Sequence, residues 1–331
     1  MGKTVLITGA AGFLGSHLTK ELLKQGHRVI GIDNLSSGKK SNIEPFLPSP
    51  EFTFFRLDVS DRQVPELYAS FGEVSEIYHL ASPASPKFYQ AKPMDTIAVN
   101  TTGTYYMLEL ALLNGAKLLF ASTSEAYGDP TVHPQPEEYC GNVNTWGPRA
   151  CYDESKRLGE VYCYEYYNRY GTAIKVARIF NTYSAGLRND DGRVISNFIT
   201  QALAGEPITV YGDGSQTRSF CYVDDNIRGL QLMMERDEAN GQIINIGNTA
   251  EYSILQVAEL VKRLTGSDSV ITYLPLPSDD PKVRRPVIQK AKRLLGWEPQ
   301  IDLEEGLSRT ISVYRERMTL GEGSYPSATN M

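Results

Sequence analysis

The sequence predicts an α/β fold with a doubly wound parallel sheet and a smaller, interwoven C-terminal lobe that binds the substrate. Short β-rich runs alternate with helical patterns over the first 180 residues, which is typical of βαβ units. A glycine-rich turn joins the first predicted strand to the first predicted helix. From about residue 181 the chain has more Gly and Pro and shorter strands, which indicates the second unit.

The predicted strands of the first half are short and apolar, and they lie at 4–8, 28–32, 53–57, 77–80, 118–121 and 174–179. Helical spacing predicts helices over 12–24, 100–114 and 152–170. Gly171 follows the last of these and is a typical helix C-cap.

The second half has its own predicted elements. Its strands are expected at 208–211, 243–246 and 270–273, and its helices at 194–204, 225–236, 254–264 and 303–317. We therefore expect a cofactor-binding domain over 1–180 to which later segments contribute, a smaller lobe over 181–318 and a flexible tail over 319–331.

Composition and charge limit the classes of function that the protein can have. The 331 residues are 41% hydrophobic and 22% charged, which is an ordinary globular composition. Thirty-three Lys and Arg against 39 Asp and Glu give a net charge of −6 without a dense basic run. The charge pattern predicts no nucleic-acid groove and no contact with an anionic membrane, so an anionic ligand would need local cations.

The cysteine pattern and the N-terminal segment indicate the cellular compartment that we expect for the protein. Four cysteines without a CxxC spacing and four scattered histidines suggest neither a disulfide framework nor a zinc site. The apolar run after Lys3 is too short for a signal peptide, and no stretch reaches the length of a membrane span. We expect a reduced, cytoplasmic protein without a metal.

The glycine turn predicts a dinucleotide site. Gly9, Gly12 and Gly15 stand between a strand and a helix, where they allow a tight turn and a close approach of the backbone to a pyrophosphate. Asp33 follows the second strand, where a carboxylate can accept both ribose hydroxyls. Its charge favours NAD over NADP, although Lys39 or a neighbouring lysine could compensate a 2′-phosphate.

A second pattern predicts proton transfer. Tyr152 and Lys156 are four residues apart and therefore share one helix face. A phenol is a poor base at neutral pH, but an adjacent ammonium would stabilise the phenolate. Ser124 and Glu125 follow a predicted strand at the sheet edge where doubly wound folds place their chemistry. A hydroxyl and a carboxylate there could bind, orient or deprotonate a substrate.

Several longer stretches resemble one family, the extended short-chain dehydrogenases/reductases that act on nucleotide sugars and have a Rossmann sheet. The stretches are 77–86, 121–128, 147–154, 191–198 and 209–218. The similarity runs from about residue 3 to residue 317 and is greatest to the UDP-glucuronate decarboxylase subfamily. It implies a tightly bound NAD that is regenerated in each cycle, a UDP-sugar substrate and a homodimer formed by the helices at 100–114 and 152–170.

The resemblance also implies a mechanism. A hydride passes from sugar C4 to NAD⁺ while Tyr152, assisted by Lys156 and Ser124, takes the O4 proton. The resulting 4-ketone is β to the C6 carboxylate, which is then lost as CO₂. Arg218 would act near C5, and Glu125 would position the substrate or a water. Reduction of the ketone would then give UDP-xylose.

The expected ligand contacts divide into two sets. Around the cofactor, besides Tyr152 and Lys156, we expect Gly9, Gly12, Phe13, Leu14, Gly15, Asp33, Asn34, Ser37, Gly38, Asp58, Val59, Leu80 and Ser82. Around the nucleotide sugar we expect Pro83, Tyr89, Glu125, Asn181, Arg193, Asn197, Tyr211, Gln216, Arg218 and Arg285.

Other activities of the group stay open to different degrees. The related 4,6-dehydratases have Asp-Glu where this chain has Ser124-Glu125, and a serine cannot protonate a leaving hydroxyl. Apiose/xylose synthases have a cysteine at that position. A 4-epimerase shares the Tyr and Lys and is the main alternative, and a binding protein without activity is a further one. The chain departs from the subfamily at Tyr183–Gly186 and at Val287, which bears on substrate fit.

Overall fold

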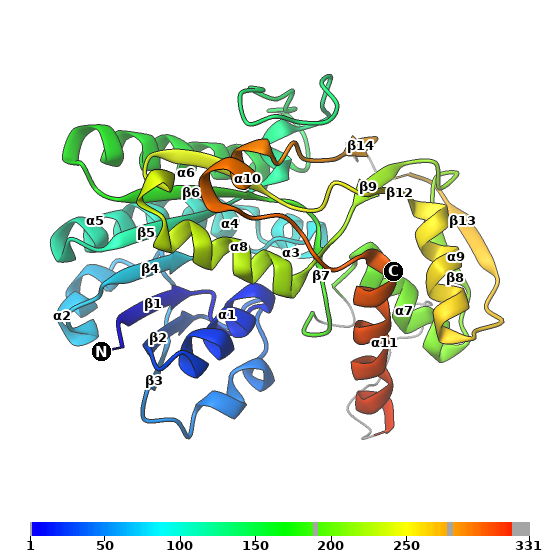
Figure 1. Cartoon of the computed structure of the whole chain (residues 1–331), viewed down its shortest axis with the longest axis horizontal. Helices are drawn as coiled ribbons and strands as arrows, with labels where there is room; N and C mark the ends of the chain where they lie inside the picture. The colour runs from blue at the N-terminus through cyan, green and yellow to red at the C-terminus, as the bar shows by residue number, and fades with distance from the viewer. Residues whose placement is uncertain (1, 188–190, 277–280, 320–331) are drawn as a thin grey trace.

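A seven-stranded parallel sheet forms the centre of the molecule (Figure 1). This computed structural model describes residues 2–187, 191–276 and 281–319. The strand order is β11-β6-β5-β4-β1-β2-β3. The strands are β1 Thr4–Thr8, β2 Arg28–Asp33, β3 Phe52–Arg56, β4 Glu76–His79, β5 Lys117–Thr123, β6 Ile174–Ile179 and β11 Gln242–Ile246. Strand order reverses between β1 and β4, so the predicted doubly wound fold is confirmed.

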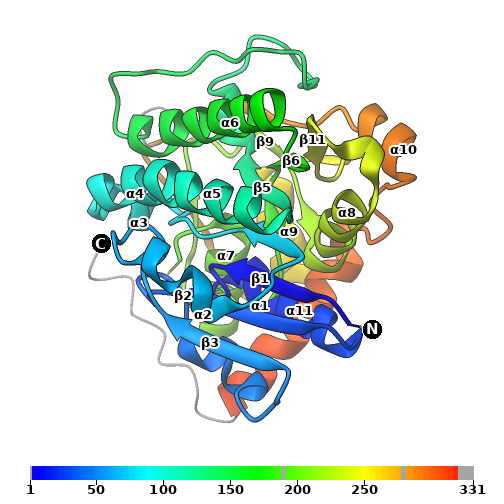
Figure 2. The same ribbon diagram turned by 90° about the vertical axis from the view of Figure 1, so that its left-hand side faces the viewer.

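Helices cover both faces of this sheet (Figure 2). On one face α5 (Thr104–Asn114) and α6 (Ala150–Tyr170) pack together, and on the other α1 (Phe13–Lys24) packs against α8 (Val223–Glu235). The strands are buried on both sides, which explains their continuous apolar runs. α6 ends at Gly171, which adopts the left-handed conformation at φ 66° as predicted.

Two elements that the sequence analysis assigns to the smaller lobe belong to the central sheet. β11 pairs in parallel with β6, and α8 packs on β5 and β6. They are later segments that contribute to the first domain. Their place could not be identified beforehand because a short strand in a Gly-rich stretch does not reveal its partner. The chain leaves the sheet after Ile179 and returns to its outer edge at Gln242, after 62 intervening residues.

The smaller lobe combines three helices with short sheets. Its helices are α7 Val194–Ala204, α9 Ile254–Thr265 and α11 Leu303–Thr319. Its strands are β8 Ile208–Tyr211, β9 Thr217–Ser219, β12 Glu251–Ser253, β13 Ile271–Leu274 and β14 Val283–Arg284. β9 is the middle strand of the sheet β12-β9-β14, so it places Arg218 directly beside Arg284.

The remaining elements are connections or short additions to these layers. They are the short helices α2 Tyr68–Phe71, α3 Pro86–Ala91, α4 Pro93–Ala98 and α10 Gln289–Leu295 and the paired strands β7 Thr182–Tyr183 and β10 Cys221–Tyr222. The helix predicted over 100–114 begins with a wider turn at Val99–Gly103 and is continuous with α4. Apart from Thr319, which ends α11, the predicted tail lies outside the described residues.

One apolar core joins the two lobes. It contains Val5 and Leu18 from the sheet and α1, and Ile199, Val257 and Leu307 from the smaller lobe. A second core lies between the sheet and the α5–α6 layer. No helix in the described part of the chain is long and apolar enough to span a bilayer.

Candidate active site

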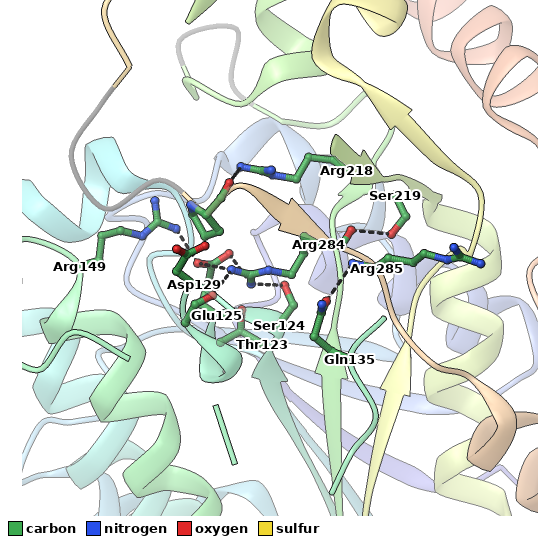
Figure 3. Close-up of polar contacts among 12 residues, drawn as sticks. Thr123, Ser124, Glu125, Asp129, Gln135, Arg149, Arg218, Ser219, Arg284 and Arg285 are labelled. Carbon is green, nitrogen blue, oxygen red and sulfur yellow. Dashed lines mark hydrogen bonds and ion pairs between the residues drawn. The ribbon is translucent and has the colours of Figure 1, made fainter. Parts of the chain in front are cut away.

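The candidate site lies where the carboxyl end of β5 meets β14 and the start of α6 (Figure 3). Thr123 ends β5, and the single turn Ser124–Tyr127 follows it. The predicted Tyr152 and Lys156 come from the first two turns of α6, and the arginines of β9 and β14 approach from the smaller lobe. Parallel sheets place ligands at this edge.

The glycine turn can pack this closely against its own backbone and against the residues after β4 only because side chains are absent. A Cβ on Gly15 would lie 2.0 Å from the carbonyl oxygen of Gly9, and one on Gly9 would lie 2.9 Å from the backbone nitrogen of Ala81. Gly9 also has a φ of +73°, which other residues rarely adopt. The turn therefore brings bare backbone to the N-terminus of α1, as a pyrophosphate site requires.

Asp33 is fixed at the end of β2, as expected. Its Oδ2 accepts a hydrogen bond from the backbone N–H of Ala11 at 3.0 Å, and its Oδ1 accepts from Leu35 at 2.7 Å. Burial raises the pKa of Asp33, although these backbone hydrogen bonds oppose the shift. Lys39, which could compensate a 2′-phosphate, donates to the Leu187 carbonyl oxygen at 3.0 Å.

The other predicted cofactor residues surround the same edge. Phe13 and Leu14 form the first turn of α1. Asn34 donates to Asp58 at 2.8 Å, while Leu80 donates its N–H to Thr8. The remaining positions lie in the connections after β2, β3 and β4, at Ser37, Gly38, Val59 and Ser82.

The departure at 183–186 is packed against this cofactor half. Ser184, Ala185 and Leu187 are buried. Asn42 donates one amide group to the carbonyl oxygens of both Ala11 and Gly186, at 3.0 and 3.3 Å. The altered sequence thus still forms a fixed segment beside the glycine turn.

Tyr152 and Lys156 are both buried, and they occupy one face of α6 as predicted. The Tyr152 ring stacks on Tyr89 with centroids 5.0 Å apart. The Lys156 ammonium donates to the Ala121 carbonyl oxygen at 2.8 Å and lies 4.9 Å from the centre of the Phe120 ring. Burial lowers the pKa of Lys156 to about 7.

The surroundings of Tyr152 in the protein alone favour its neutral phenol. Burial raises its pKa to about 12, and a hydrogen bond with Thr123 only partly opposes this shift. The ammonium of Lys156 is directed to a backbone carbonyl, so in the protein alone it does not stabilise a phenolate. The phenol is therefore the resting form until a ligand changes its surroundings.

The hydroxyl partner of Tyr152 is also different from the one predicted. Thr123 makes that contact, whereas Ser124 accepts a hydrogen bond from Arg284 at 3.0 Å. The two residues are neighbours at the end of a strand, where side chains alternate in direction. Sequence position alone did not distinguish them.

Glu125 is held by two guanidinium groups. Its Oε2 accepts from Arg149 at 2.6 Å, and its Oε1 accepts from Arg284 at 3.0 Å. Burial alone would raise the pKa of Glu125, but the charges of Arg284 and Arg149 outweigh that effect and lower it to about 2. The carboxylate is therefore ionised at every physiological pH.

Arg218 lies beside this cluster, but Arg284 and Arg149 have the larger effect on Glu125. The Arg218 guanidinium donates to the carbonyl oxygens of Thr217 at 2.9 Å and Pro281 at 2.5 Å, and its charge is a lesser contribution at Glu125. Arg284, its neighbour across the sheet, donates to both Ser124 and Glu125 and is almost fully buried. Arg284 is not among the site residues predicted from the sequence.

Several predicted substrate residues have buried polar atoms without a hydrogen-bond partner among the described residues. They are the Tyr89 hydroxyl, the Asn181 amide nitrogen, the Gln216 amide oxygen and the Arg285 Nε. Buried polar groups are rarely left unpaired. Tyr89 stacks on Tyr152, so its hydroxyl is placed for a polar ligand of this site. The Arg285 side chain instead points away from Glu125 and pairs with Glu251 at 3.9 Å (Figure 3).

The other predicted substrate residues lie around these atoms. Arg193 precedes α7 and pairs with Asp191 at 2.9 Å, and its charge acts on Tyr152. Tyr211 is more than one-third exposed at the end of β8. Asn197 is in the first turn of α7, and Pro83 precedes α3. Among the described residues, no group of three or more His, Cys, Asp or Glu could hold a metal.

The family follows from comparison with known proteins. Residues 5–247 match the NAD dependent epimerase/dehydratase family. The chain belongs to this family. UDP-glucuronic acid decarboxylase 1 of Xenopus tropicalis is 52% identical over 316 residues, which are 96% of this chain and 73% of that protein.

Solved structures agree with the fold. The UDP-glucose 4-epimerase of Thermotoga maritima, solved with UDP-glucose, has a TM-score of 0.88 and 32% identity over 95% of this chain and 99% of that one. The UDP-glucuronic acid 4-epimerase of Bacillus cereus, solved with UDP-glucuronic acid and NAD, has a TM-score of 0.85 and 30% identity with the same coverage.

Proposed function

We propose that this protein is an NAD-dependent decarboxylase that converts UDP-glucuronate into UDP-xylose and CO₂. The observation that carries the proposal is the cluster of half-buried Glu125 with buried Ser124 and Arg284 next to Tyr152. With NAD bound as the hydride acceptor, a tyrosine and a lysine suffice for the proton transfer at O4. The cluster provides charged groups for a second step at C5 and C6. The 52% identity to a UDP-glucuronic acid decarboxylase supports this assignment.

The cofactor site fits NAD. The glycine turn, which packs too closely to accept a Cβ at Gly9 or Gly15, would hold the pyrophosphate, and Asp33 would hold the adenosine ribose. When bound, NAD supplies the acceptor for the C4 hydride and later returns it. Asn42 and Lys39 donate hydrogen bonds to the carbonyl oxygens of Gly186 and Leu187 and so hold this segment beside the turn. The segment would help to retain the nucleotide between cycles.

Tyr152 acts in the first step. It takes the O4 proton as C4 is oxidised, and Thr123 holds its oxygen in place. Its raised pKa must fall for this role, and the positive nicotinamide ring supplies a charge of the right sign. Lys156 adds to that effect when its ammonium is released from the Ala121 carbonyl oxygen.

Decarboxylation follows from the position of the new ketone. The C5–C6 bond breaks, its electron pair moves toward the C4 oxygen as an enolate, and the C6 carboxylate leaves as CO₂. Tyr152, now protonated, donates a hydrogen bond to the enolate oxygen. We assign to Glu125 and Arg284 the task of holding the water whose proton then reaches C5.

The nucleotide sugar would provide hydrogen-bond partners for the buried polar atoms that lack one. Asn181, Gln216 and Arg285 can donate to or accept from its hydroxyl and phosphate oxygens. Arg193 would bind the diphosphate, since an anion needs a local cation in an acidic protein.

We further propose a homodimer in the cytoplasm. The faces of α5 and α6 away from the sheet expose large apolar and aromatic side chains, which is typical of an interface. They are Tyr105, Leu112, Leu113, Leu158, Val161, Tyr164, Tyr167 and Tyr170.

A UDP-sugar 4-epimerase is the second candidate, because solved epimerases share the fold at 30–32% identity. An epimerase performs no chemistry at C5. The ion pairs around Glu125 would then have no catalytic task, which makes this candidate the weaker one.

The test supplies purified protein with UDP-glucuronate labelled at the carboxyl carbon, without added NAD. We expect labelled CO₂ and one equivalent of NAD released on denaturation. Conversion of UDP-glucuronate to its C4 epimer without CO₂, or interconversion of UDP-glucose and UDP-galactose, would replace the proposal with the epimerase.

A further inference from the structure

Arg149 connects two parts of the site that are separate in the sequence. Its backbone carbonyl accepts the N–H groups of Tyr152 at 3.0 Å and of Asp153 at 3.1 Å, which begins α6. Its guanidinium reaches across to Glu125 at 2.6 Å (Figure 3). One residue thus fixes both the helix with the proton-transfer tyrosine and the carboxylate after β5.

The two arginines on Glu125 come from different lobes. Arg284 belongs to β14 of the smaller lobe, and it is itself held by Ser124 and by the Gly128 carbonyl oxygen at 2.9 Å. Arg149 belongs to the helix layer of the large sheet. Glu125 therefore keeps one cationic partner that does not depend on the position of the smaller lobe.

Charged and titratable side chains from several elements surround Glu125. The cations are Arg149 before α6, Arg284 on β14 and Arg218 on β9. The groups whose protonation responds to Glu125 are Asp153 and Tyr152 on α6 and Tyr89 on α3. Without Arg149, the charge of Glu125 would act more strongly on Asp153 and Tyr152, and the C6 carboxylate would bring one more negative charge.

We propose that Arg149 is a positioning residue for the decarboxylation step, which holds the Glu125 carboxylate in place beside the start of α6. It acts through Glu125 rather than on the sugar. This inference rests on the proposed decarboxylase function and assigns a role to a residue that the mechanism above does not use.

The role predicts a separation of the two half-reactions. Arg149→Gln removes the guanidinium but keeps the backbone carbonyl that begins α6, so C4 oxidation should fall much less than CO₂ release. A misplaced Glu125 should slow CO₂ release by about 10²-fold, the usual effect of a displacement of about 1 Å in a catalytic group.

The experiment measures both half-reactions in single turnovers of the NAD-loaded enzyme, with NADH absorbance for oxidation and carboxyl-labelled UDP-glucuronate for CO₂. Arg149→Lys retains the charge without the forked geometry. It should restore part of the rate of CO₂ release but not the full rate, and it serves as the second variant if Arg149→Gln does not fold. Arg157→Gln is the matched control, because Arg157 ties α6 to the same turn through the Ala126 carbonyl oxygen without touching Glu125.

Equal loss of oxidation and CO₂ release in Arg149→Gln would overturn the proposal, as would wild-type CO₂ release. Failure of the proposed function looks different, because the unmodified enzyme would then release no CO₂ at all.

Discussion

Tyr152 is the residue on which turnover depends most directly. It is buried, stacked on Tyr89 and hydrogen-bonded by Thr123. Tyr152→Phe removes the proton acceptor and leaves the stacked ring. We expect turnover to fall at least about 10³-fold while NAD stays bound, as measured by CO₂ release and by NAD content after denaturation. Turnover within a few-fold of wild type would show that another group takes the O4 proton.

Arg284 and Arg218 differ in their contacts, and their variants should differ accordingly. Arg284→Gln removes two hydrogen bonds to Glu125 and one to Ser124. NADH should then accumulate, while CO₂ release falls by about 10²-fold or more. Arg218→Gln loses contacts to backbone carbonyls and should have a smaller effect. A larger effect at Arg218 would restore the assignment made from the sequence.

The part of the site that local geometry determines could be predicted from the sequence. Tyr152 and Lys156 share a helix face because residues four apart always do. Arg284 could not be assigned in this way, since it lies 160 positions from Ser124 and meets it only through the pairing of β14 with β9. The choice between Thr123 and Ser124 depends on the side-chain direction at the last residue of β5.

At the scale of elements, the contact of α6 with β5 positions the site. A Cβ on Gly159 would lie 2.5 Å from the ring of Phe120, which is fully buried and lies under the Lys156 ammonium. Gly159→Ala should therefore lower stability by about 1–3 kcal/mol, although alanine favours helix. Thermal unfolding would measure this, with Arg169→Ala on the same helix as the control. An unchanged or raised Tm would mean that the two elements separate more easily than their packing indicates.

His79 joins three elements and makes stability depend on pH. Its ring contacts Thr8 at 2.7 Å on β1 and Thr104 at 3.1 Å on α5. Burial, followed by the charge of Lys156, lowers its pKa to about 3. Between pH 6.5 and 3 the unfolded chain binds a proton that the native chain does not, so stability falls as the pH falls. The loss should reach about 2 kcal/mol at pH 5.

Urea unfolding at pH 7 and pH 5 tests this effect. His79→Gln cannot titrate, so it should lose less stability between the two pH values than the wild type, whereas His27→Gln should behave like the wild type. Equal pH dependence in all three proteins would assign the effect to other groups.

Elements with strong periodicity could be predicted within one or two residues, among them β1, β6 and α7. The two-residue strands β7, β10 and β14 could not, because such short pairings have no period of their own and form only where the tertiary structure brings backbone together. β14 is the most consequential of them, since it carries Arg284.

At the scale of the whole molecule, the exposed face of α5 and α6 predicts a dimer. Leu113 and Tyr164 are 71% and 65% exposed. Leu113→Asp with Tyr164→Asp would place two charges in the interface, and sedimentation should then give a monomer at micromolar concentration. Val270→Asp, on an exposed site of the smaller lobe, should remain dimeric. A monomeric wild type would contradict the prediction.

The shared core explains why the two lobes could not be separated by sequence. Ile199 and Leu307 of the smaller lobe belong to the same apolar cluster as Val5 and Leu18. Composition revealed a change of texture near residue 181, but the chain crosses between the lobes afterwards, and β11 and α8 return to the sheet. A composition shift marks where a new lobe begins and does not show which later segments stay in it.

The most direct test of the central claim follows the sugar by NMR in D₂O, with UDP-glucuronate as substrate and no added NAD. Loss of C6 requires a solvent proton at C5, so the predicted product is UDP-xylose with one deuterium at C5, formed together with CO₂. A C6 sugar that keeps its carboxylate, whether unchanged or inverted at C4, and has no deuterium at C5 would contradict the account.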